Sequence, residues 1–151
     1  MNHLPVRNCK LVELSKVHDV RGNLSVVESG ITVPFEIKRV YYLYDVPAGS
    51  DRGGHSHRDL WQIILPVSGS FTIRIDDGIN SCNVPLSLPN VGLIIGPGVW
   101  RVLHSFSSNA VCIVLASQHY DEDDYIRDYD EHVTIFCGSK RIGGSNASSV
   151  S

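Results

Sequence analysis

The stretch SFTIRIDDG, residues 70–78, alternates apolar and polar side chains with the period of a β-strand. Successive strand residues point to opposite faces, so Phe71, Ile73 and Ile75 would share one face and the polar residues between them the other. The Asp-Gly pair at residues 77–78 is typical of a hairpin turn. The pattern therefore predicts a half-buried antiparallel strand that ends in a tight turn.

Similar strand-like segments recur through most of the chain. Short apolar runs recur roughly every ten residues between clusters of Gly, Pro, Asn and Asp, as in an all-β barrel or sandwich. Further strands are predicted at residues 24–28, 37–45, 61–67, 91–95 and 110–117. Pro47, Pro85, Pro89 and Pro97 fall between predicted strands, where the missing N–H group disturbs no ladder. These observations predict an all-β fold.

A short helix is predicted near the C-terminus, where the apolar period changes. Its apolar face would be formed by Tyr125, Ile126, Tyr129 and Val133. Asp121 could cap its first turn. The surrounding stretch HYDEDDYIRDYDEH, residues 119–132, contains seven carboxylates but lacks the glycine and the ligand order of a calcium loop. We therefore interpret it as a solvated, capped helix and not as a cation site.

Length and composition predict one domain. The chain has 151 residues, of which 42% are hydrophobic, and this is enough for one sizeable core. We predict that the domain covers residues 1–136. Residues 137–151 are mostly small and polar and have little to bury, so they are predicted to form a flexible tail.

The net charge and the cysteine content limit which partners the protein is expected to bind and in which compartment it is expected to lie. With 13 basic and 16 acidic residues the net charge is -3, which gives no general attraction for nucleic acid or an anionic membrane. The four cysteines lie far apart without a C-x-x-C pair, which disfavours both a zinc finger and a disulfide framework. The sequence has neither a signal-peptide layout nor an apolar run long enough to span a bilayer. A cytoplasmic protein is expected.

A pair of histidines carries the first functional motif. His55 and His57 would share one strand face. The stretch around them resembles the first motif of the cupin superfamily. It consists of Gly49, five residues, His-Ser-His, four residues, Gln62, six residues and Gly69. In metal-binding cupins this motif supplies two histidines and a glutamate, and a second motif, P-x-G-x-x-H, supplies the last histidine.

The metal-binding version of this motif is incomplete in this chain. Gln62 stands at the glutamate position, and in GLIIGPGVW, residues 92–100, Trp100 lies nearest the position of the last histidine. A neutral amide does not offset the charge of a divalent cation, and an indole offers no lone pair. We therefore predict no metal, although His104 could supply a third nitrogen. An uncoordinated imidazole, with a reference pKa of about 6.5, suits proton transfer near neutral pH.

Six segments resemble the WxcM-like sugar 3,4-ketoisomerases, which act on dTDP-4-keto-6-deoxyglucose. They are RGNLSVVE (21–28), VPFEIKRVYYLYDV (33–46), RGGHSHRDLWQ (52–62), GSFTIRIDDG (69–78), VGLIIGPGVW (91–100) and VLASQHYDEDDYIRDYD (114–130). The similarity runs from about residue 7 to residue 136, and IKRVYY and YDEDDYIRDY are its most specific pieces. It implies a cupin fold, that is, a double-stranded β-helix or jelly-roll barrel. It also implies a homodimer that serves 3-amino-3,6-dideoxyhexose synthesis for surface polysaccharides such as O-antigen.

The implied reaction moves a carbonyl from C4 to C3 of the sugar through an enediol. It needs a base for the C3 proton, a proton relay and donors that stabilise enolate charge, but neither a redox cofactor nor a metal. His55 matches the active-site histidine of the family and is our candidate base. His57 would position it or share the relay.

Tyr41 is the candidate for the relay. Alternation along IKRVYYLYD places Arg39, Tyr41 and Leu43 on one face and Tyr42 and Tyr44 on the other, so the tyrosines cannot all line one pocket. The resemblance favours Tyr41, whereas composition alone does not choose among them.

Arginines are expected to bind the substrate, because a dTDP group carries two phosphates. The candidate binding residues are Arg21, Arg39, Arg52, Gln62, Trp100 and Arg101. Arg21 and Arg101 could also line the sugar end of the pocket and influence which face of C4 receives the proton. The sequence leaves open whether the product is gluco or galacto.

Three alternatives remain open at the level of sequence. The first is a dTDP-sugar 3,5-epimerase-like cupin, which would leave the carbonyl at C4. The second is a non-catalytic module that binds nucleotide sugars through the same histidines. The third and weakest is a metal-dependent dioxygenase, which would require iron despite Gln62.

Overall fold

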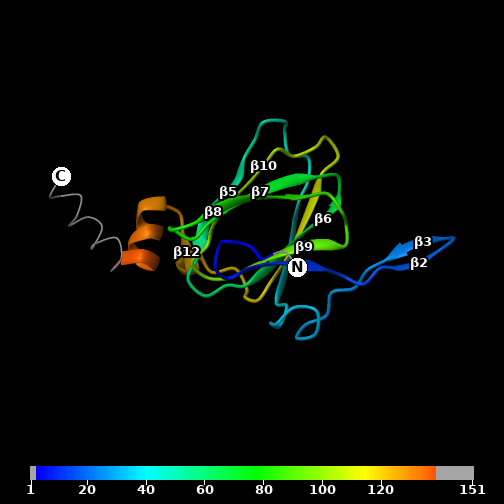
Figure 1. Ribbon diagram of the computed structural model, residues 1–151, viewed down its shortest axis with the longest axis horizontal. Coiled ribbons are helices and arrows are strands. Elements are labelled where there is room, and N and C mark those ends of the chain that lie inside the picture. The colour runs from blue at the N-terminus through cyan, green and yellow to red at the C-terminus, as the bar shows by residue number, and fades with distance from the viewer. Residues whose placement is uncertain (1–2, 139–151) are drawn as a thin grey trace.

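Two five-stranded antiparallel sheets form the body of the molecule, and they face each other across a hydrophobic core (Figure 1). In the computed structural model, residues 3–138 are described. The first sheet has the order β1 (Cys9–Glu13), β9 (Val91–Ile95), β6 (Gln62–Ser68), β11 (Val111–Ala116) and β4 (Arg39–Leu43). The second has the order β12 (Tyr125–Ile126), β5 (Arg52–His57), β10 (Trp100–His104), β7 (Phe71–Asp76) and β8 (Ser81–Leu86). The all-β prediction is confirmed.

Three smaller elements complete the described chain. The hairpin of β2 (Val17–Asp19) and β3 (Gly22–Leu24) projects from the body of the molecule (Figure 1). A 3-10 turn, η1 (Glu122–Asp124), precedes β12, and a helix at residues 129–138 follows it. No helix within residues 3–138 is long and apolar enough to cross a membrane.

Burial in the core confirms the alternation predicted for residues 70–78. Phe71, Ile73 and Ile75 of β7 are buried, and they pack with Leu93 of β9 and Val114 of β11 from the opposite sheet. Burial of one such side chain contributes about 1.5–3 kcal/mol. The hydrophobic pattern therefore fixes which face of each sheet looks inward, and hence which side chains meet in the interior.

The predicted strands are mostly confirmed, with two corrections. The strand predicted at residues 24–28 is wrong, because β3 ends at Leu24 and no ladder follows it. Instead, Val27 packs onto a second apolar cluster on the outer face of the first sheet, with Leu65. Pro85 lies inside β8 and not between strands. It is tolerated there because β8 is an edge strand.

The helix prediction is right in kind but wrong in position. Asp121 caps the 3-10 turn, where its side chain accepts a hydrogen bond from the Asp123 backbone. Tyr125 and Ile126 then pair with β5 as strand β12, and the helix begins only at residue 129. It continues to residue 138, and Cys137 is 7% exposed, whereas the domain boundary at residue 136 stays a prediction. The remainder of the predicted tail lies outside the described residues.

Candidate active site

A cavity of about 480 Å³ opens between the two sheets. This volume lies within the range of small-molecule binding sites. Its polar lining residues are Arg39, Tyr41, Asp51, Arg52, His55, Gln62, Arg101, Tyr125 and Arg127. Most of the residues that the sequence analysis selected therefore meet in one place.

Strand β4 supplies one wall of the cavity. Arg39, Tyr41 and Leu43 line it, whereas Tyr42 and Tyr44 are exposed on the outer face. The predicted alternation is confirmed. Burial raises the pKa of Tyr41 to about 12, so its hydroxyl stays protonated at neutral pH and can donate a hydrogen bond.

A bulge in β5 sets the position of His55. Opposite Arg101 and Val102 of β10 lie His55 and Gly53, so β5 has one extra residue, Gly54, between the two pairs. Gly54 has a φ of 72°, a left-handed conformation that glycine adopts without steric cost. The bulge brings His55 directly across from Arg101, and both line the cavity.

The environment of His55 keeps its ring neutral. Burial, followed by the charges of Arg101 and Arg127, lowers the pKa of His55 to about 3, while a hydrogen bond to the Gly53 backbone acts in the opposite direction. Its Nε2 atom is buried and has no hydrogen-bond partner within the described chain. A neutral imidazole with a free ring nitrogen can accept a proton.

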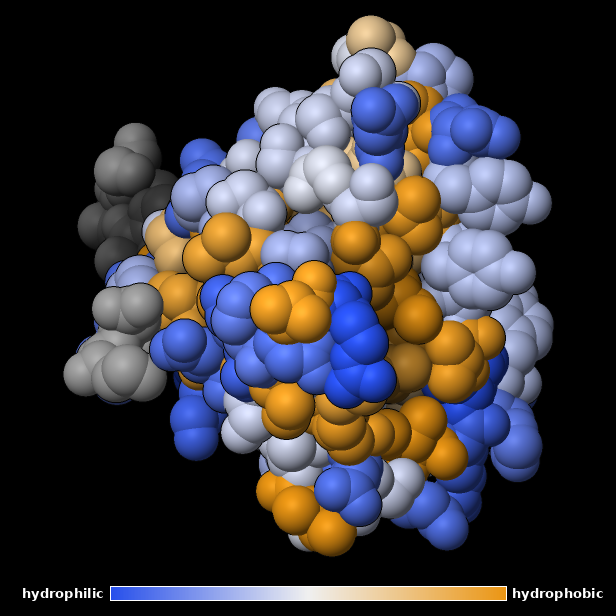
Figure 2. Space-filling model, turned by 90° about the vertical axis from the view of Figure 1, so that its right-hand side faces the viewer, coloured by the Kyte–Doolittle hydropathy of each residue, from blue (hydrophilic) through white to orange (hydrophobic). Residues whose placement is uncertain are grey.

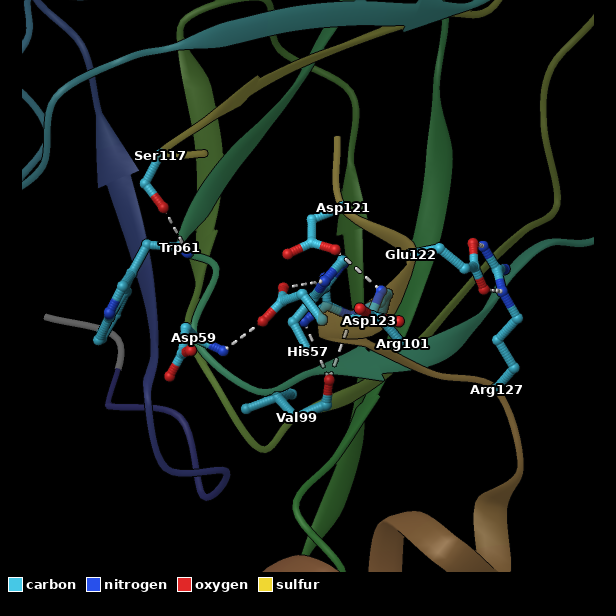
Figure 3. A network of polar contacts seen from close by, with 11 residues as sticks. His57, Asp59, Trp61, Val99, Arg101, Ser117, Asp121, Glu122, Asp123 and Arg127 are labelled. Atoms are coloured by element: carbon cyan, nitrogen blue, oxygen red, sulfur yellow. Dashed lines mark hydrogen bonds and ion pairs between the residues drawn. The ribbon is translucent and has the colours of Figure 1, made fainter. Parts of the chain in front are cut away.

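His57 lies next to His55 but does not line the cavity. The two rings meet edge to face with centroids 4.8 Å apart. His57 is wholly buried, and its Nδ1 atom lies 2.8 Å from Oδ2 of Asp124. The other oxygen of Asp124 accepts the Asp59 backbone N–H at 2.7 Å (Figure 3).

Sequence reasoning missed Asp124 and Tyr125. Asp124 belongs to the acidic stretch that the sequence analysis interprets as a solvated helix, yet it is only 6% exposed. The ring of Tyr125 lies 5.0 Å from that of His55 and 4.4 Å from that of His57. One sequence signal pointed to this region: the segment YDEDDYIRDY is among the pieces most specific to the resembled family.

Arg101 is a buried cation without a carboxylate partner. It is 1% exposed, and its Nε and Nη2 atoms donate to the Val99 carbonyl at 3.1 and 3.0 Å (Figure 3). Within residues 3–138 its Nη1 atom has no hydrogen-bond partner and no ion pair joins it to an acidic group. Burial lowers the pKa of Arg101 to about 10, so the group remains charged at neutral pH. A charge buried without a partner is costly, which makes this position suited to an anion.

Further arginines surround the cavity. Arg39, Arg52 and Arg127 contribute to its lining. Arg127 forms an ion pair with Glu122 at 2.7 Å and lies over the Tyr125 ring. A cavity with this distribution of positive charge attracts anionic ligands such as a diphosphate.

Two predicted binding residues lie elsewhere in this structure. Arg21 sits at the turn of the β2–β3 hairpin, where it is exposed and ion-paired to Asp19 at 2.6 Å. Trp100 lies on the outer face of β10, because it precedes the inward-facing Arg101, and it packs against Tyr129 and His132. Neither Arg21 nor Trp100 lines the cavity of this single chain, and their roles in substrate binding stay predictions.

His104 does not join the histidine pair. It lies on the same outer face of β10 as Trp100, where its ring contacts Ser105 at 2.8 Å and Asn83 at 3.3 Å. Within the part of the chain that the structure describes, no three His, Cys, Asp or Glu side chains are grouped as metal ligands. Gln62 does reach the cavity beside His55, and its Oε1 atom is buried without a partner in the described chain.

Comparison with known proteins identifies the family. The family model FdtA, described as WxcM-like, C-terminal, matches residues 7–136. The chain is 45% identical over 121 residues to a TDP-4-oxo-6-deoxy-alpha-D-glucose-3,4-oxoisomerase of Aneurinibacillus thermoaerophilus, covering 80% of this chain and 87% of the relative.

Solved structures agree with this assignment. A mutant of the 3,4-ketoisomerase QdtA from Thermoanaerobacterium thermosaccharolyticum, in complex with TDP-4-keto-6-deoxyglucose, is similar with a TM-score of 0.85 and 40% identity, over 87% of this chain and 95% of that one. The WlaRB TDP-quinovose 3,4-ketoisomerase from Campylobacter jejuni has a TM-score of 0.82 and 44% identity, over 85% and 98% of the two chains. The chain therefore belongs to the WxcM-like FdtA family, whose fold it shares.

Proposed function

We propose that this protein is a sugar-nucleotide 3,4-ketoisomerase that converts dTDP-4-keto-6-deoxyglucose into a dTDP-3-keto-6-deoxyhexose. One observation carries the proposal: a neutral histidine, His55, and an unpaired buried cation, Arg101, lie opposite each other on the wall of one cavity. A base beside an anion-stabilising group is the arrangement that enolisation of a ketone requires. The names of the relatives support the same activity.

The first step is removal of the C3 proton. The proton goes to a ring nitrogen of His55, and the C3–H electrons form a C3–C4 double bond while the C4 carbonyl electrons move onto O4. The resulting enediolate carries its negative charge on O4, where the Arg101 guanidinium stabilises it. Arg101 needs no reorganisation for this task, because its donors to Val99 already hold it inside the barrel.

The second step returns a proton to C4. The hydroxyl proton on O3 is lost as the C3 carbonyl forms, and C4 takes up the proton held by the active site. Tyr41, protonated and facing the cavity, is the group that passes protons between O3 and O4. Protons and electrons balance within the sugar, so the reaction needs no external oxidant, redox cofactor or metal.

The diphosphate is expected to bind among the arginines at the cavity. Arg39 and Arg52, both selected from the sequence, line it together with Arg127. Forked guanidinium groups pair well with phosphate oxygens. Gln62 can donate an amide hydrogen bond to the sugar from the cavity floor.

We also expect a homodimer located in the cytoplasm. The β2–β3 hairpin and the residue pair after it expose apolar side chains at Val17, Val20, Leu24 and Val26, and Figure 2 shows hydrophobic residues gathered on the face from which this hairpin projects. Such a surface suits burial against a second copy. All four cysteines are free thiols, which supports a reducing compartment. Light scattering during gel filtration tests the dimer.

Product analysis tests the activity. The protein is incubated with dTDP-4-keto-6-deoxyglucose in D2O, and the sugar products are examined by NMR. The expected result is a carbonyl at C3 with deuterium at C4, and the couplings at C4 assign the gluco or galacto product. A carbonyl that stays at C4 with inversion at C3 and C5 would identify an epimerase, and binding without deuterium uptake would identify a non-catalytic module.

A further inference from the structure

A buried carboxylate beneath the cavity holds the second histidine. Asp124 and His57 are both buried, and their contact joins residues 67 positions apart in the sequence. Each oxygen of Asp124 has one donor: Oδ2 faces Nδ1 of His57, and Oδ1 accepts the backbone N–H of Asp59. This side chain is thus part of the interior, unlike its exposed neighbour Asp123.

The contact selects one tautomer of His57. An ionised carboxylate can only accept hydrogen bonds, so the ring must carry its proton on Nδ1. Burial lowers the pKa of His57, and the charge of Arg101 acts in the same direction, so the ring is neutral and Nε2 keeps its lone pair. The Nε2 atom is buried without a hydrogen-bond partner in the described chain, so the Asp124 contact is the polar contact that orients the ring.

The orientation of His57 is transmitted to His55 through direct packing. The two rings meet nearly at right angles, with an interplanar angle of 86°. Tyr125 contacts both rings, and it follows Asp124 in the sequence and pairs with His57 across β12 and β5. A single short segment therefore fixes His57 by a hydrogen bond and confines His55 by contact.

Asp124 also contributes charge near Arg101. Burial lowers the pKa of Arg101, and the charge of Asp124 is one of several smaller influences, led by Tyr41, that act in the opposite direction. Asp124 is not within ion-pair distance of Arg101, so it leaves the guanidinium available to the cavity.

We propose that Asp124 is a positioning residue for the isomerisation: by accepting the Nδ1 proton of His57, it holds that ring in one tautomer and one orientation, and so keeps His55 aimed into the cavity. The inference deepens the proposed function and rests on it. Asp124 does not line the cavity, so its proposed effect is indirect.

The variant Asp124→Asn tests this role. If the amide NH2 faces His57, the ring must move its proton to Nε2; if the amide turns over, the NH2 opposes the Asp59 backbone donor. The first orientation changes the tautomer of His57 and the second loses the contact with Asp59, and neither changes the size of the side chain. We expect kcat to fall by about 10- to 100-fold with KM within about threefold, the range measured when supporting residues of functional groups are removed. Asp123→Asn, an exposed neighbour in the same turn, is the matched control and should keep wild-type kcat.

Nitrogen-15 NMR of the histidine rings gives a second measurement that is independent of activity. We expect wild-type His57 to be protonated on Nδ1, with its signal assigned by its loss in His57→Gln, and we expect Asp124→Asn to change that pattern. Wild-type kcat in Asp124→Asn, equal losses in Asp123→Asn, or an Nε2 proton on wild-type His57 would each overturn the proposal. A lowered Tm with unchanged kcat per folded molecule would mean a merely structural role. If the wild type forms no 3-keto sugar, the proposed function fails, whereas the tautomer measurement still decides the Asp124 contact.

Discussion

Acidification should leave the base function of His55 intact over a wide range. The ordinary pKa of a histidine side chain is 6.5, and the cavity lowers that of His55 to about 3. At pH 5 an ordinary histidine is only about 3% neutral, whereas a group of pKa about 3 is about 99% neutral. Between pH 7 and pH 5 an ordinary histidine base would lose about 25-fold in activity, whereas His55 would lose almost none.

The direction of the expected pH effect follows from the role of His55 as a base. Only the unprotonated ring can remove the C3 proton, so a lowered pKa extends the active range toward acid. The measurement is kcat/KM from pH 8 to pH 4.5 at constant ionic strength, with product quantified by NMR, because kcat/KM reports the ionisation of the free enzyme. Circular dichroism at each pH verifies that the protein stays folded, since the buried neutral histidines favour unfolding as the pH falls below 6.5.

A matched pair of variants tests the cause. Arg127 is the third-largest contributor to the lowered pKa of His55, after burial and Arg101. Arg127→Gln should therefore move the acid limb upward, whereas Arg74→Gln, on the exposed face of β7, should leave it in place. A fall of about 25-fold between pH 7 and pH 5, with a midpoint near 6.5 in a folded protein, would refute the reasoning.

Three further predictions concern single residues. His55→Asn should lower kcat by about 10²- to 10⁴-fold, the usual contribution of a general base, while calorimetry should show TDP binding within a few fold of wild type. Tyr41→Phe should lower kcat because it removes the relay hydroxyl, whereas Tyr42→Phe, on the exposed face of the same strand, should not; equal rates for the two variants would exclude the relay role. Gly69→Ala should prevent stable folding, because a Cβ there would clash with Oγ of Ser107 and meet the Ala110 backbone at 2.8 Å. Gly49→Ala, which has a φ of 81° and open space, should cost only about 1–2 kcal/mol in urea unfolding.

The sequence predicted the strand at the opening stretch because its alternation coincides with burial. The pattern at Phe71, Ile73 and Ile75 is clear because one face of β7 is buried and the other is not. The prediction failed at residues 24–28, where Leu24 ends β3 and Val27 packs on the outer face of a sheet without joining a ladder. Pairing depends on partners far away in the sequence, and a local pattern does not report whether such a partner exists.

The site was predictable where a motif fixes the face of a strand. His55 and Tyr41 were chosen from short motifs, and both reach the cavity because their strands alternate as expected. Trp100 does not reach the cavity of this chain, because a shift of one residue along a strand reverses the face to which a side chain points. Asp124 was not predictable, since nothing in a run of acidic residues says which carboxylate the fold will bury.

The positive charge of Arg101 would affect both groups in the proposed proton transfer, the histidine that accepts the proton and the sugar carbon that loses it. Arg101 lowers the pKa of His55, which by itself makes the histidine a weaker base. The same charge stabilises the enediolate, and so lowers the pKa of the C3–H bond that the histidine must break. The driving force depends on the difference between these two pKa values, so the two effects of Arg101 offset each other in part. In the proposed complex a diphosphate in the cavity would add negative charge and raise the pKa of His55 again, so the proposed base would become stronger when the nucleotide sugar binds.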